Sequence, residues 1–235
     1  MAKDDLFPKD HWSGPKIDPQ RKGDPTPQPL YEAVGAALSA WERVEESIAK
    51  LALVFSRVKD AEAATAVRHI FGSIESSSVR LNVVQTLAEI HFGQFWKAPE
   101  IGKRFNQLKA GITSASHRRN EIAHGTLAPN LTVARLSETG EQVNDSYGCF
   151  LVASEYLISR NRSYNSPWDM GDPLAFIQSK YRYTAGDIWA FEGKFSALNM
   201  LLIQHAASCN LNEAGLPRNV FQLLQERAER DEPLT

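Results

Sequence analysis

Apolar residues recur at three- and four-residue steps through most of this 235-residue chain, which constrains the bulk of it to amphipathic helices. The spacing predicts helices over residues 30–58, over 61–92 with a break near Gly72, over 101–125, and from Thr184 onward. We therefore expect a mainly α fold.

The period changes after the third of these stretches. Alternating residues flank a turn at Thr139-Gly140 and predict a β-hairpin insertion at about 126–153; they are Leu131, Val133, Tyr147, Cys149 and Leu151. Residues 155–183 contain asparagines, prolines and a glycine that break regular structure, so we expect loops there with one short strand or turn. Asp187 follows Thr184 at the spacing of a capping box and predicts where the last long helix begins.

The composition fits one globular domain, which we expect at residues 30–208. Residues 1–29 hold half of the 12 prolines and few large apolar groups, so we expect a flexible N-terminal tail. The alternative is an extended arm that packs through Leu6, Phe7, Trp12 and Ile17. Residues 209–235 are expected to form a short helix from Pro217 and a tail.

The net charge of -2 argues against a protein that coats nucleic acid by bulk electrostatics, so any RNA contact must be local. The third helical stretch offers such a patch, although a solvated helix face is the simpler interpretation of each cation taken singly. Against Glu121 alone, this stretch carries Lys103, Arg104, Lys109, Arg118 and Arg119.

Two cysteines, Cys149 and Cys209, are too few and too far apart to staple a chain of this size, which suits a reducing cytoplasm. We see no signal peptide and no apolar run near the roughly 20 residues that span a bilayer. We expect a cytoplasmic protein that does not bind membranes.

An arginine interrupts the apolar stripe of the third helix. Arg119 falls at the centre of a stripe formed by Ile101, Phe105, Leu108, Ile112, Ala115 and Ile122. A buried, unpaired guanidinium would cost several kcal/mol, so Arg119 needs an anionic partner or an opening to solvent. Glu45 likewise interrupts the apolar face of the first helix, and we expect it to pair with Arg119.

His124 follows Arg119 five residues later, and Gly125 supplies a natural stop for the helix. Asn120 lies four residues before His124, where a hydrogen bond between the two side chains would fix the imidazole tautomer.

The segment Arg119-Asn120-Glu121-Ile122-Ala123-His124 resembles the R-(x4 to 6)-H signature of HEPN domains, in which Asn, Asp or His often follows the arginine. The resemblance covers roughly residues 30–205. It implies an antiparallel helical bundle that forms homodimers, and a metal-independent endoribonuclease whose two motifs face each other across the interface. A toxin or phage-defence role would bring a neutralising or activating protein partner.

The resemblance also implies the roles of individual residues. His124 would be the general base or acid and Arg119 would bind the phosphate, while Asn120 would orient the imidazole or contact phosphate. RNA would supply its own 2'-hydroxyl as nucleophile, leaving a 2',3'-cyclic phosphate. We expect His117, Arg118 and Lys109 to help bind the substrate.

Five residues of ideal helix separate Arg119 from His124 by roughly 140° and about 7.5 Å, so one helix does not easily aim both at one phosphate. We therefore tie activity to a dimer that joins two motif helices. Thr126 stands where toxins silenced by nucleotide modification carry a tyrosine, which argues against that subclass.

Other interpretations stay open. Arg119 could form a structural ion pair, and His124 could contact the last helix carbonyls. The whole chain could be a non-catalytic helical dimer that binds RNA, nucleotide or protein. A glycine-rich phosphate loop, a C-x-x-C pair and an H-x-x-x-H pair are all missing from the sequence, so we expect neither a cofactor nor a metal.

Overall fold

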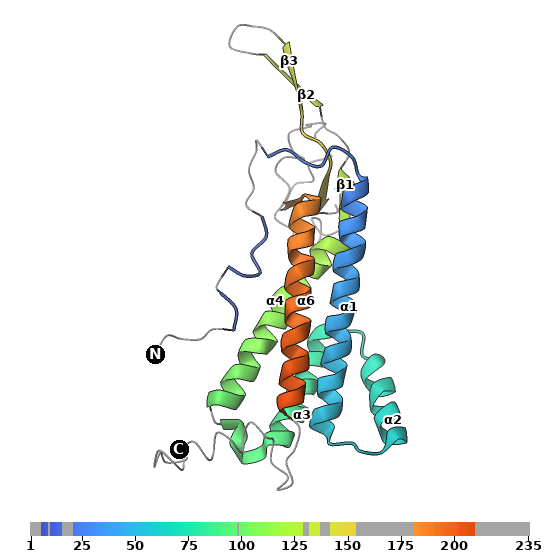
Figure 1. Ribbon diagram of the computed structural model, residues 1–235, viewed down its shortest axis with the longest axis vertical. Coiled ribbons are helices and arrows are strands. Elements are labelled where there is room, and N and C mark those ends of the chain that lie inside the picture. Colours follow the sequence, from blue (N-terminus) through green and yellow to red (C-terminus); the bar gives the residue numbers. More distant parts are fainter. Residues whose placement is uncertain are drawn as a thin grey trace. The chain divides into compact units, whose positions relative to one another are not determined.

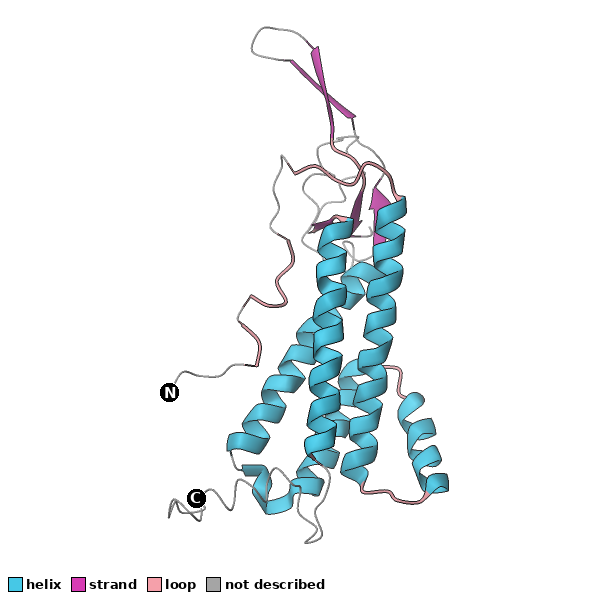
Figure 2. Cartoon of the chain, in the orientation of Figure 1, coloured by secondary structure: helices cyan, strands magenta, loops and turns pink. Residues whose placement is uncertain are grey.

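The chain is mainly α-helical with a small antiparallel sheet, as predicted (Figures 1 and 2). The computed structural model describes residues 6–8, 10–15, 21–97, 99–128, 132–136, 142–153 and 181–209. Its α-helices are α1 (Gln28–Ser56), α2 (Ala61–Gly72), α3 (Ser77–Phe92), α4 (Arg104–Ala123) and α6 (Ala185–Ser208). The predicted break near Gly72 separates α2 from α3, as expected.

Two short turns lead into α4. A 3-10 turn (Gly93–Lys97) follows α3, and a π-helical turn (Pro99–Lys103) precedes the α-helix. Proline opens the π-helical turn, where its missing N–H leaves no intrahelical hydrogen bond unmade.

The predicted hairpin after α4 is confirmed, but it consists of two separate ladders. Strand β1 (Gly125–Ala128) pairs with β4 (Phe150–Ala153), and β2 (Thr132–Leu136) pairs with β3 (Gln142–Ser146). The short strand β5 (Arg182–Tyr183) joins β4 and completes a sheet in the order β1-β4-β5. The turn predicted at residues 139–140 lies outside the described residues.

Gly148 explains why the strand is interrupted between β3 and β4. Its φ of 76° lies in the left-handed region that disfavours side chains. A Cβ there would also lie 2.7 Å from the backbone oxygen of Asp24. The predicted alternation of Tyr147 and Cys149 thus falls on this break rather than within a strand.

The described contacts group the chain into two compact units, and α1, α4 and α6 contribute to both. Unit 1 comprises residues 1–11, 42–116 and 196–235; unit 2 comprises residues 12–41 and 117–195.

Each unit has an aromatic core. In unit 1, Phe55 of α1 contacts rings from α3, α4 and α6, namely Phe92, Phe105 and His205. In unit 2, Trp41 of α1 meets Phe195 of α6 edge-on, with ring centroids 5.5 Å apart. Trp41 and Phe195 are fully buried, so their contact contributes apolar burial between α1 and α6.

The predicted capping box at the start of α6 is confirmed. The backbone N–H of Thr184 donates to the Asp187 carboxylate at 2.8 Å, and the N–H of Asp187 donates to the Thr184 hydroxyl at 3.3 Å. Aspartate therefore serves where glutamate is preferred. Arg21 adds an ion pair to the same carboxylate, at 2.6 Å.

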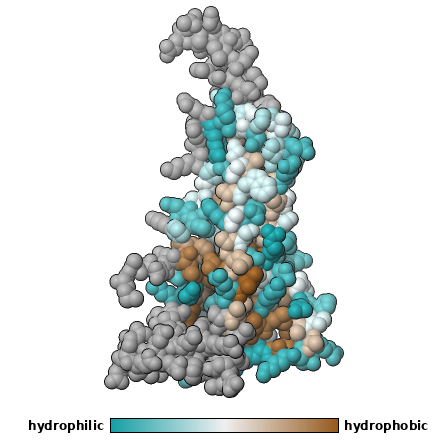
Figure 3. All heavy atoms as spheres, in the orientation of Figure 1, coloured by the Kyte–Doolittle hydropathy of each residue, from teal (hydrophilic) through white to brown (hydrophobic). Residues whose placement is uncertain are grey.

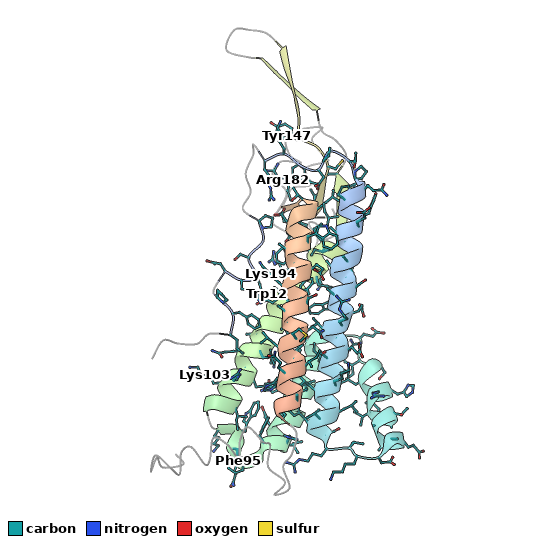
Figure 4. The ribbon with its side chains drawn as sticks, viewed as in Figure 1. Trp12, Phe95, Lys103, Tyr147, Arg182 and Lys194 are labelled. Carbon is teal, nitrogen blue, oxygen red and sulfur yellow. The ribbon has the colours of Figure 1, made fainter. Side chains whose placement is uncertain are left out.

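The N-terminal segment is a packed arm in its described residues, which corrects the expectation of a free tail for that part. Trp12, which is labelled in Figure 4, is buried. Its ring stacks on that of Phe195. Asp24 forms a two-way backbone bridge with Cys149 and accepts a hydrogen bond from the N–H of Ala185. Buried aromatic area and backbone pairing offset the ordering entropy that composition alone predicts to dominate.

The apolar stripe of α3 is a second correction. Helical spacing predicts a buried stripe of Val79, Val83, Leu87 and Ile90, but the first and last of these residues are exposed. Val79 and Ile90 are 47% and 70% exposed, and apolar side chains of other helices also reach the surface (Figure 3). The buried face consists instead of Leu81, Val84, Ala88 and Phe92. Both sets have helical spacing, so periodicity alone could not choose between them.

Gly125 tests the packing of β1 against β4. A Cβ at this position would lie 2.5 Å from Cγ of the buried Leu151, so Gly125→Ala should lower the free energy of unfolding by about 1–3 kcal/mol. Gly35 in α1 has no atom within 4 Å of such a Cβ, so Gly35→Ala should stabilise by about 0.5–1 kcal/mol. Urea unfolding of both variants measures the difference, and a Gly125→Ala protein as stable as wild type would contradict this packing.

His205 should make unit 1 sensitive to acid. Burial, aided by the Arg104 charge, lowers the pKa of His205 from 6.5 to about 4. The folded state holds the imidazole neutral, so its contribution is present above pH 6.5 and is lost as the pH falls toward 4. We expect His205→Gln to flatten the fall in urea-unfolding free energy over this range, by roughly 3 kcal/mol at most. The matched variant His69→Gln, at an exposed position, should leave the slope unchanged.

Candidate functional site

Arg119 and Asn120 lie in the last turns of α4, and His124 directly follows that helix; all three belong to unit 2. The helix ends at Ala123, and the backbone N–H of His124 still donates to the carbonyl of Asn120 at 3.0 Å. Gly125 then begins β1 with an ordinary negative φ, so it does not stop the helix in the left-handed form that the sequence suggested. Its lack of a side chain serves the close packing of Leu151 instead.

Three polar side chains of the motif region share one exposed face of α4. His117, Asn120 and His124 are all exposed and follow each other at steps of three and four residues. Ala115 and Ile122 are buried, as the predicted apolar stripe requires. The apolar stripe therefore directs the imidazoles to solvent.

Arg119 lies between the buried and the exposed face of α4, and its side chain contacts a residue of the exposed face. Its side chain is half-buried, and its Nη1 donates to Oδ1 of Asn120 at 3.1 Å. A long stem over apolar neighbours with a hydrated head is the usual way for arginine to occupy such a position. The contact ties the guanidinium to the side chain of the residue that lies one turn before His124.

Asn120 therefore has a different partner from the one predicted. Its side-chain oxygen accepts from Arg119 rather than bonding the imidazole of His124, and only its backbone carbonyl is linked to His124. A guanidinium is a charged donor, so it competes well for this amide oxygen. The Asn120 side chain therefore orients Arg119 and does not fix the tautomer of His124.

Arg118 points into a buried polar cluster instead of toward a substrate. Its Nη1 contacts the Glu121 carboxylate at 2.6 Å and the Tyr183 hydroxyl at 3.2 Å. The Tyr183 hydroxyl donates to the same carboxylate at 2.6 Å, and Glu121 is only 8% exposed. The prediction that Arg118 binds RNA is corrected, because this guanidinium neutralises a buried carboxylate.

Tyr181 and the N-terminal arm complete this cluster. The Tyr181 hydroxyl donates to the backbone carbonyl of Glu121 at 2.9 Å. The arm passes so close that a Cβ on Gly14 would lie 2.9 Å from Nη1 of Arg118 and 3.3 Å from the Tyr183 hydroxyl. Gly14 therefore lets the chain cover the ion pair.

The remaining predicted residues are used within unit 1. Lys109 donates its ammonium to the side-chain oxygens of Asn82 and Gln85 on α3, at 2.9 and 2.6 Å. These two hydrogen bonds hold the ammonium in place, so Lys109 links α4 to α3.

Glu45 does not pair with Arg119, which corrects that prediction. Its two oxygens accept from Arg80 and Ser77, each at 3.0 Å. Arg80 lies on α3, and its Nε also donates to the carbonyl of Ile74, so this guanidinium is held in a fixed direction. The half-buried Glu45 therefore pairs with Arg80, whereas Arg119 donates to its sequence neighbour Asn120.

Sequence reasoning missed Glu121, Tyr181 and Tyr183 as site-forming residues. The three-residue step from Arg118 to Glu121 was a visible signal for an ion pair. Nothing local marked the tyrosines, because they contact Glu121 from 60 and 62 residues away in the sequence.

The described residues show few other chemical groups. No three His, Cys, Asp or Glu side chains in this part of the chain converge as ligands for a metal ion. None of the described helices is both long and apolar enough to cross a bilayer.

Comparisons with known proteins supply no relative. The chain matches no family model, and it resembles no curated protein and no solved structure to a significant degree. Any functional conclusion therefore rests on the motif and on the geometry described above.

Tyr183 should make stability fall at alkaline pH. Burial, then the hydrogen bond and charge of Glu121, raise the pKa of Tyr183 above its usual 10, and burial does the same for Tyr181. The folded state holds both phenols neutral, so this stability is present below pH 10 and is lost as the pH rises further.

We expect Tyr183→Phe to be about 1–2 kcal/mol less stable at pH 7, because the Glu121 carboxylate loses a donor. The loss should shrink between pH 9 and 11, since phenylalanine does not ionise. Urea unfolding across this range measures both effects, with Tyr31→Phe as a control at a 61% exposed position. A Tyr183→Phe deficit that stays constant with pH would contradict the coupling.

Proposed function

We propose that the chain is a metal-independent endoribonuclease of the HEPN type that acts as a homodimer in a toxin or phage-defence role. The observation that carries the proposal is the hydrogen bond from Arg119 to Asn120, which ties a guanidinium to a side chain on the exposed face that also carries His124. A phosphate-binding cation and an acid–base imidazole on one exposed face are the groups that RNA transesterification requires.

The division of labour follows from the chemistry of each side chain. Arg119 is always charged and presents several N–H groups, so it binds the phosphate and stabilises the charge that grows on its oxygens. His124 transfers a proton at the 2'-hydroxyl or at the leaving oxygen. Asn120 is a positioning residue, because its amide oxygen holds Arg119.

The charge around the motif supports a local RNA contact despite the net charge of -2. Glu121 is the acidic residue within the motif, and it is buried and paired with Arg118. Its charge is thus largely neutralised, so the Glu121 carboxylate does not oppose an anionic substrate at Arg119.

A homodimer would place two such faces around one RNA strand. Because each α4 carries its own Arg119, Asn120 and His124, a two-fold axis near this face doubles the phosphate contacts. An activating or neutralising protein partner would then act by uncovering or covering the paired faces.

The test is cleavage of single-stranded and structured RNA by the purified chain in EDTA, with analysis of product ends. We expect 2',3'-cyclic phosphate and 5'-hydroxyl ends, and a loss of about 10²–10⁴-fold for His124→Ala. Arg119→Ala should lose activity at least as strongly, while Asn120→Ala should lose less because the guanidinium remains.

The exposed His69 on α2 offers a matched control, so His69→Ala should cleave like wild type. Cleavage that survives in His124→Ala would contradict the assigned chemistry. A folded wild-type dimer that binds RNA without cleaving it would instead favour a non-catalytic binding module.

A further inference from the structure

A second imidazole occupies the same face of α4 as His124. His117 is exposed and lies three residues before Asn120, while His124 lies four residues after it. Seven residues are close to two full turns, so the two histidines differ by only about 20° in direction and about 10.5 Å in height. Asn120, with the Arg119 guanidinium hydrogen-bonded to it, lies between them along the helix.

The cleavage reaction needs two proton transfers at opposite ends of one phosphate. The 2'-oxygen forms a bond to phosphorus and loses its proton, and the bond from phosphorus to the 5'-oxygen breaks. The 5'-oxygen leaves with the electron pair of that bond and gains a proton. One group must therefore accept a proton while another donates one, and a single imidazole cannot serve both ends at once.

We propose that His117 is the second proton-transfer residue, so that His117 and His124 act as the acid–base pair on a phosphate held by Arg119. This inference rests on the proposed nuclease function and changes the role of His117 from substrate binding to catalysis. The order of the residues along the helix fits the order of the reacting atoms. The two imidazoles correspond to the 2'-oxygen and the 5'-oxygen, and the Arg119 guanidinium, hydrogen-bonded to Asn120, corresponds to the phosphate between them.

His117 is exposed and lies in the same unit as His124, unlike His69, His91 and His205 on the other α-helices. His91 and His205 belong to the core of unit 1, where burial lowers the pKa of each and favours the neutral form. His69 is exposed, but it lies on α2 in the other unit. Within unit 2, the described histidines are His117 and His124.

The experiment compares two RNA substrates that differ in one atom. One has the ordinary 5'-oxygen at the scissile bond, and the other has sulfur in its place, which leaves as a thiolate without needing a proton donor. Wild type, His117→Ala, His124→Ala and the control His69→Ala are assayed on both, in EDTA, from pH 4 to 9. Thermal unfolding of each variant checks that the fold is retained.

We expect wild type to show a bell-shaped dependence of kcat/KM on pH, and each of the two motif-face variants to lose one limb of it. On the oxygen substrate, both variants should be slowed at least about 10²-fold. On the sulfur substrate, one of them should recover to within about tenfold of wild type, which identifies the acid, while the other stays slow and is the base.

Two results would overturn the inference while leaving the nuclease function intact. The first is His117→Ala cleaving the oxygen substrate like wild type. The second is that wild type is active but sulfur rescues neither variant. A wild type that cleaves neither substrate would overturn the proposed function itself, and the inference with it.

Discussion

The buried ion pair between Arg118 and Glu121, closed by the Tyr183 hydroxyl, fixes the rotation of the last turns of α4. A carboxylate that is 8% exposed needs such partners, since an uncompensated buried charge would cost several kcal/mol. Once these two residues face inward, the helical period places His117, Asn120 and His124 outward. The chemistry proposed for the exposed face thus depends on a polar cluster that never touches the substrate.

This arrangement also separates two neighbouring arginines by function. Arg118 belongs to the buried cluster, whereas Arg119 reaches the amide of Asn120 at the surface. Successive residues on a helix point about 100° apart, so adjacent identical side chains can serve stability and substrate binding respectively. The N-terminal arm reinforces the division, because it approaches the half-buried Arg118 and its partner Tyr183 closely at Gly14.

The sequence pattern predicted the features that depend on interactions between residues close together in the chain. Helical periodicity placed α1, the break between α2 and α3, and α6 with its capping box, because amphipathic spacing and caps act within a few residues. The partners of Glu45 and Glu121 could not be found this way, since Arg80 and Tyr183 approach from distant parts of the sequence. The outward stripe of α3 was mistaken for the inward one for a related reason: two apolar faces on one helix carry the same period.

The proposed chemistry requires that Arg119, His117 and His124 act on one phosphate. NMR titration of the side-chain signals with a 2'-deoxy oligonucleotide, which cannot be cleaved by this chemistry, tests it most directly. We predict that both imidazoles and the Arg119 guanidinium shift together with one Kd, and that Asn120→Ala weakens that Kd. Imidazole signals that stay unmoved at saturation, or that follow a different Kd from Arg119, would contradict the claim.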